Sequence, residues 1–130
     1  ELLINPLPDD VKPLVLKRGY WLPDEAASVY SRAFMVLSFE CHSPIIAAVN
    51  KTPMFYLRQP EDTIKGQMYY DLGFDDWTFE IEQTEGRQIA EKLMEIWNNY
   101  QAAQAKLHER MNSVGKIYAE RVNRMHDTIK

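Results

Sequence analysis

The sequence has a single cysteine, Cys41, so no disulfide can form within the chain. It also lacks any apolar run near the roughly 18 residues that cross a bilayer, and its start does not have the layout of a signal peptide. Its 15 basic residues are outnumbered by 19 acidic ones and form no run interleaved with aromatic residues. These absences argue against a membrane span and a nucleic-acid groove, and they leave the cytoplasm as the expected compartment.

The length of 130 residues, 45% of them apolar, suits one domain with its own core. The chain begins at Glu1 rather than at a methionine, and the stretch that follows is rich in proline and has no periodicity. We therefore expect a piece of a longer protein, in which residues 1–13 are a linker or a truncated start. Residues 14–84 are predicted to form an α/β core, and residues 85–130 a helical segment that packs on it.

Three apolar segments have the length and composition of strands, namely residues 34–39, 54–57 and 77–81, and residues 14–16 are a candidate for a fourth. The first two are continuous apolar runs, which are typical of strands covered on both faces in a parallel sheet. The third alternates between apolar and polar residues, which is typical of an edge strand with one solvated face.

Helix start and stop signals lie between these strands. Pro23 begins a helix expected to run to about Arg32, and Ser43 caps a short, buried one. Thr63 caps a third helix, and Gly73 stands where a left-handed C-terminal cap is needed. The sequence thus predicts a small, mostly parallel, Rossmann-like sheet flanked by helices, with its ligand site outside the carboxyl ends of the strands.

The last third of the chain carries one long apolar stripe with a mean spacing of about 3.6 residues, the period of a straight helix. We expect a long helix or a helix pair, with a bend near Asn98–Asn99 or Gly115, or else a face that packs on another domain. Part of the stripe is predicted to stay exposed and to promote self-association into a homo-oligomer. The stripe consists of Ile89, Leu93, Ile96, Tyr100, Ala103, Leu107, Met111, Val114, Tyr118, Val122, Met125 and Ile129.

Polar side chains follow the first predicted strand, immediately before an apolar helix. Ser38, Glu40, His42 and Ser43 are placed where free helix N–H groups and the helix dipole attract a phosphate or a carboxylate. Glu40 is a general acid or base, or the partner that orients His42. In the simpler alternative, Ser43 is only a helix cap and His42 a hydrogen-bonded, half-buried residue.

Two cations follow the second strand. Arg58 comes directly after an apolar run and offers a fork for a carboxylate or phosphate, and Lys65 adds a point charge from the next helix. The alternatives are an ion pair of Arg58 with a nearby acid of its own loop, Glu61 or Asp62, and a solvated Lys65. If Arg58 and His42 share one crevice, they define an anion-binding site.

The residues from Trp21 to Gly73 resemble the carboxyl-terminal half of polysaccharide pyruvyl transferases. The most specific features of the likeness are a strand that ends in His42 before an apolar helix, the turn at Thr52–Pro53 and the strand after it, and Lys65 shortly before Leu72–Gly73. The likeness covers roughly residues 20–100. Family members often have arginine two positions before this histidine, where the present chain has Glu40, of opposite charge.

This resemblance implies the carboxyl-terminal half of a glycosyltransferase-B-like fold, with phosphoenolpyruvate and a sugar acceptor bound between this half and an absent amino-terminal domain. Family enzymes transfer a pyruvyl group from phosphoenolpyruvate to a sugar as a ketal, in the synthesis of surface polysaccharides, without a cofactor. By analogy, His42 and Glu40 would be catalytic, and Ser38, Ser43, Arg58 and Lys65 would bind the donor. These six are the candidate site residues.

The sequence is also compatible with two other functions. The first is the nucleotide-sugar-binding half of a glycosyltransferase or an epimerase, because similar residues at strand ends occur in those folds. The second is a non-catalytic relic domain that keeps the fold and uses its long helix only for assembly. In every case, we expect the isolated chain to be inactive as an enzyme.

Overall fold

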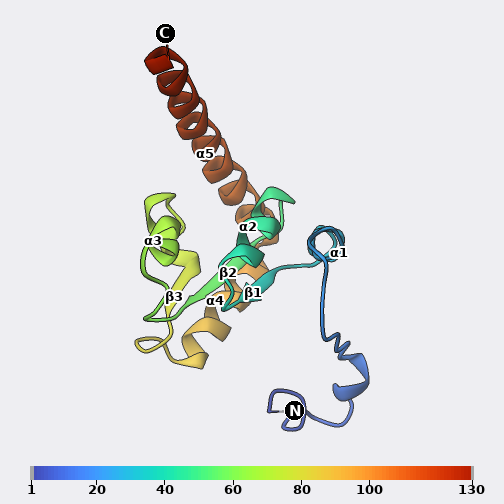
Figure 1. Cartoon of the computed structure of the whole chain (residues 1–130). Coiled ribbons are helices and arrows are strands. Elements are labelled where there is room, and N and C mark those ends of the chain that lie inside the picture. Colours follow the sequence, from blue (N-terminus) through green and yellow to red (C-terminus); the bar gives the residue numbers. More distant parts are fainter. Residues whose placement is uncertain (1, 130) are drawn as a thin grey trace.

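A three-stranded parallel sheet forms the centre of the computed structural model, which describes residues 2–129 (Figure 1). The strands are β1 (Val36–Ser38), β2 (Met54–Arg58) and β3 (Thr78–Glu80), in the spatial order β1-β2-β3. Both neighbouring pairs are parallel, with Val36 level with Met54 and Tyr56 level with Thr78. This arrangement confirms the predicted order of strands and helices and the parallel sheet.

Helices connect and flank the strands. Between β1 and β2 lies α2, and α3 begins the connection from β2 to β3, so the two helices carry the parallel crossovers. The helices are η1 (Lys12–Leu14), α1 (Pro23–Tyr30), α2 (His42–Val49), α3 (Thr63–Asp71), η2 (Asp75–Trp77), α4 (Gly86–Asn98) and α5 (Tyr100–Ile129).

The core is built around the central strand β2. Its first four residues, 54–57, have at most 5% of their surface exposed, because neighbouring elements cover both faces of the sheet. Tyr56 stacks on Tyr69 of α3 with ring centroids 4.4 Å apart, and Phe55 meets Phe79 of β3 at 5.0 Å. Trp77, 2% exposed, closes the core beside β3.

The structure corrects two predicted strands. Residues 14–16 form no strand, because η1 ends at Leu14 and the next residues find no neighbouring strand to pair with in the described chain. The run 34–39 contributes only Val36–Ser38, because the ring of Phe34 turns to Trp97 and Tyr100, with centroids 5.1 and 4.6 Å away. The third strand is shorter than predicted, Thr78–Glu80, and lies at an edge as expected.

The long apolar stripe is divided between two helices. Asn99, with φ −142° and ψ 60°, leaves the helical region and separates α4 from α5, so the predicted break near Asn98–Asn99 is confirmed. The helix continues through Gly115 without interruption. Figure 1 shows the second half of α5 projecting away from the sheet. None of the helices within residues 2–129 is long and apolar enough to cross a membrane.

Candidate functional site

The carboxyl end of β1 leads into α2 through a tight polar turn. Ser38 is the last residue of β1, and its hydroxyl accepts a hydrogen bond from the backbone N–H of Glu40 at 2.9 Å. The same hydroxyl donates to the carbonyl oxygen of Glu40 at 3.1 Å. Ser38 therefore stabilises the turn by binding the backbone of Glu40, and in this way it positions the side chain of Glu40.

The carboxylate of Glu40 caps α2. One oxygen accepts the backbone N–H of His42 at 2.9 Å, and the other accepts the N–H of Ser43 at 2.9 Å and its hydroxyl at 3.2 Å. Burial alone would raise the pKa of Glu40, but the hydrogen bonds from His42 and Ser43 outweigh it and lower that pKa below its ordinary value. The two amides expected to hold a foreign anion thus hold the chain's own carboxylate.

This cap also corrects the predicted role of Ser43. The helix begins at His42, so Ser43 lies inside its first turn, and Glu40 rather than Ser43 supplies the capping oxygens. The side chain of Ser43 is shared between Glu40 and the hydroxyl of Tyr30, which donates to it at 3.2 Å. Thr63 is likewise the first residue of α3 instead of its cap.

His42 lies exposed beside Glu40. Its Nδ1 contacts the Glu40 carboxylate, and the side chains of His42 and Glu40 are 66% and 56% exposed. The Nε2 atom has only a weak contact with the sulfur of Cys41, at 4.0 Å. The ring therefore has one nitrogen held by the protein and one directed to solvent, which is the arrangement needed for a proton carrier.

The ligand atoms of Glu40, Cys41 and His42 lie within 4.8 Å of one another, the spacing of a metal site. Both oxygens of Glu40 are, however, occupied by the amides of α2. The pKa of Cys41 is raised by burial and by the charge of Glu40, which disfavours the thiolate that a metal requires. The positive end of α2 opposes a cation as well, so the cluster is better explained as a helix cap.

Arg58 ends β2, the neighbour of β1, but its guanidinium is committed to α3 and β3. Nη1 donates to Glu80 at 2.6 Å and Nη2 to the carbonyl of Thr63 at 3.2 Å, with the side chain 20% exposed. The hydroxyl of Tyr70 donates to the same Glu80 oxygen at 2.8 Å. The ion pair considered for Arg58 is therefore present, but with Glu80 of the next strand instead of its own loop.

Gly66 makes room for this arginine. A Cβ atom built at Gly66 would lie 2.1 Å from Nε of Arg58, far inside contact distance. The arginine stem therefore crosses the first turns of α3 at the one position where no side chain stands. The sequence offers no signal for this, because an arginine eight residues earlier does not reveal where its side chain runs.

Lys65 is the cation left available near the site. It is exposed, and no hydrogen bond or ion pair of its amine is found within residues 2–129. It lies in the first turn of α3, and its charge lowers the pKa of Asp62 and opposes the upward shift of the Cys41 pKa. The structure thus brings together Ser38, Glu40, His42 and Ser43, and turns the guanidinium of Arg58 toward β3.

Two tyrosines beneath the site are not among the candidate site residues that the sequence offers. The hydroxyl of Tyr69 donates to the carbonyl of Cys41, which ties α3 to the turn that carries Glu40. The hydroxyl of Tyr56 is buried and has no hydrogen-bond partner among the described residues. Burial and the nearby Asp62 raise the pKa of Tyr56, so the hydroxyl stays protonated.

No protein-family model matches the sequence, and no curated protein and no solved structure is significantly similar to it.

Proposed function

We propose that this chain supplies one half of a transferase of the polysaccharide pyruvyl transferase type, which moves a pyruvyl group from phosphoenolpyruvate to a sugar. The observation that carries the proposal is the exposed imidazole of His42 at the carboxyl end of a parallel strand, with Nδ1 held by Glu40. This location is where α/β sheets bind ligands. The resemblance of residues 20–100 to that family supports the same assignment.

In the proposed reaction, His42 donates a proton to the terminal carbon of phosphoenolpyruvate, and a sugar hydroxyl bonds to the neighbouring carbon, which carries the positive charge. The proton of that hydroxyl returns to His42. A second hydroxyl of the sugar then bonds to the same carbon, and the bond between that carbon and the phosphate oxygen breaks. The proton of the second hydroxyl leaves with the phosphate. Glu40 orients the imidazole through its contact with Nδ1.

An anionic donor can be bound at this site only by side chains, because the free amides at the start of α2 already bind Glu40. Glu40 fills the amide positions of α2, but its pair with protonated His42 carries no net charge. Lys65 then provides the positive charge that a carboxylate or phosphate needs. Arg58 acts indirectly, because its bonds to Glu80 and Thr63 hold α3, the helix that carries Lys65.

Phosphoenolpyruvate should bind the chain, and His42→Ala should weaken that binding by about tenfold, the loss of one charged hydrogen bond. Isothermal titration calorimetry measures both affinities. His126→Ala is the matched control, because its side chain is 67% exposed and belongs to the projecting part of α5. Equal affinities of the His42→Ala variant and the natural chain would refute the assignment of His42.

A parallel titration with uridine and guanosine nucleotides separates the proposal from its main alternative. Binding of a nucleotide without phosphoenolpyruvate would favour the nucleotide-sugar-binding half of a glycosyltransferase or epimerase. Binding of neither would favour a non-catalytic domain. Lys65→Ala should weaken phosphoenolpyruvate binding in the proposed case, and the exposed Lys51→Ala should leave it unchanged.

The chain by itself should show no transferase turnover. Glu40 and His42 are more than half exposed, so nothing in the described residues excludes water from the reacting atoms. Two substrates also need positioning from both sides of a cleft. A phosphate-release assay with phosphoenolpyruvate and candidate sugars measures this directly. Sustained release by the purified chain would show that this half alone is a complete enzyme.

A further inference from the structure

The projecting end of α5 carries an apolar stripe with no cover. Residues 115–129 are all exposed, including Tyr118 at 71%, Met125 at 62% and Ile129 at 86%. An isolated helix of about 15 residues is only marginally stable in water, because most helix stability in proteins comes from packing an apolar face. The stripe continues the face that α5 buries against the sheet domain through Ala103 and Leu107.

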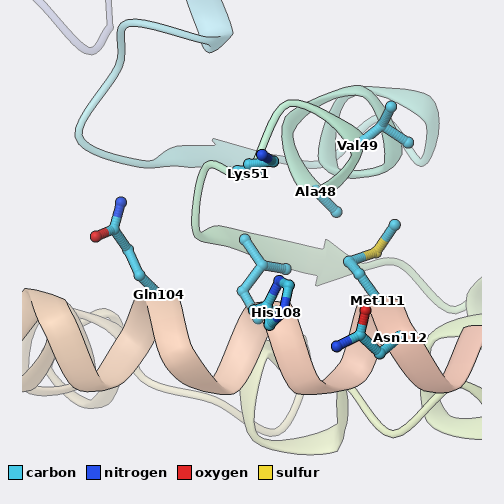
Figure 2. A pocket seen from close by; sticks show the side chains of 8 residues that line it. Ala48, Val49, Lys51, Gln104, His108, Met111 and Asn112 are labelled. Atoms are coloured by element: carbon cyan, nitrogen blue, oxygen red, sulfur yellow. The ribbon is translucent and has the colours of Figure 1, made fainter.

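A groove opens where this buried face ends. It lies between α2 and α5, has a volume of about 430 Å³, and has an apolar floor that includes Ala48, Leu107 and Met111. Figure 2 shows Lys51, Ala48 and Val49 on one side of the groove, and Gln104, His108 and Met111 of α5 extending toward it from the other. The polar side chains of Lys51, Gln104, His108 and Asn112 also line it. An apolar segment with a polar outer side would fit this groove.

The spacing of the stripe fits a second copy of α5 as the occupant. From Leu107 to Ile129 the apolar residues follow one another at intervals of four, three, four, four, three and four residues. This pattern is the same in both directions, with Tyr118 at its centre. In an antiparallel pair of α5 helices centred on Tyr118, Ile129 is level with Leu107 of the other copy and Met125 with Met111. Apolar residues therefore meet at every step.

An in-register parallel pair would also bring apolar residues level with one another. It would, however, place both sheet domains at the same end of the pair and leave both α2–α5 grooves without an occupant. The antiparallel pair instead offers the free end of one α5 to the groove of the other copy. The overlap from Leu107 to Ile129 is about 33 Å long, at 1.5 Å per residue.

We propose that the chain forms a two-fold symmetric dimer in which the α5 helices pair antiparallel around Tyr118, and the end of each helix fills the α2–α5 groove of the other copy. The dimer covers the exposed stripe and stabilises the projecting helix. It is independent of the proposed transferase function, because the groove lies at the C-terminal end of α2 and His42 at its start.

Sedimentation velocity over a wide concentration range should show a monomer–dimer equilibrium. Met125→Glu should raise the dissociation constant at least about tenfold, since it places a charge opposite Met111. Asn123→Glu is the control, because Asn123 lies on the opposite side of the same helix and is exposed. A monomer at every concentration, or a dimer that Met125→Glu leaves intact, would overturn the proposal.

Cysteine cross-linking tests the direction of the pair in a Cys41→Ser background. Tyr118→Cys should give a covalent dimer on oxidation, because residue 118 lies at the two-fold axis. A mixture of Met111→Cys and Met125→Cys chains should cross-link more completely than either variant alone. Cross-linking through residue 118 without this mixed product would show a parallel pair, and would also overturn the proposal.

Discussion

Gly66→Ala should lower the free energy of unfolding by about 2 kcal/mol, the cost of inserting a methyl group into an occupied position. The new Cβ atom would lie 2.1 Å from Nε and 2.6 Å from Cδ of Arg58. Arg58 would then have to leave its bonds to Glu80 and Thr63, and Glu80 would lose its cationic partner. Urea unfolding followed by circular dichroism measures the effect.

Gly115→Ala is the matched control, because both glycines lie inside helices. A Cβ at Gly115 meets nothing within 4 Å in the described structure, so this variant should gain about 0.5–1 kcal/mol from helix propensity alone. It is measured at low protein concentration, where dimers do not contribute. In an Arg58→Ala background, Gly66→Ala should no longer destabilise the protein. A persistent loss in that background would show that Arg58 is not the obstacle.

Glu40→Ala should cost about 1–2 kcal/mol of stability, because α2 loses the carboxylate that accepts the amides of His42 and Ser43. Thermal unfolding of this variant can be compared with Glu61→Ala, which removes an exposed loop carboxylate of the same charge. The Glu61 variant should change stability by less than about 0.5 kcal/mol. Equal effects of the two changes would contradict the capping role of Glu40.

The stabilisation by Glu40 should depend on pH. Because the pKa of Glu40 is lowered in the folded protein, the stabilisation is fully present above its ordinary value of 4.5 and is lost as the pH falls through the folded value. The difference in unfolding free energy between the natural chain and Glu40→Gln should therefore shrink below this pH. A difference that stays constant from neutral pH down to acid would show that the carboxylate charge is not involved.

The sequence predicted much of the fold because the relevant signals are local. Continuous apolar runs indicated the first two strands, and Gly73 adopts the left-handed conformation expected of a helix end, with φ 78°. The break at Asn98–Asn99 was also expected from the sequence. Residues 14–16 were predicted as a candidate strand and form none, because a strand also needs a neighbour, and that requirement does not appear in its own residues.

In the candidate site too, the sequence predicted which elements carry the residues, but not where their side chains point. The order of strands and helices was sufficient to place His42 at the start of a helix and Arg58 at the end of the adjacent strand. The direction of the charged side chains depended on partners distant in the chain. Arg58 turns to Glu80, 22 residues away, and Tyr69 reaches back 28 residues to Cys41. A charged group takes the partner that best compensates its desolvation, and only the packed structure determines which partner is within reach.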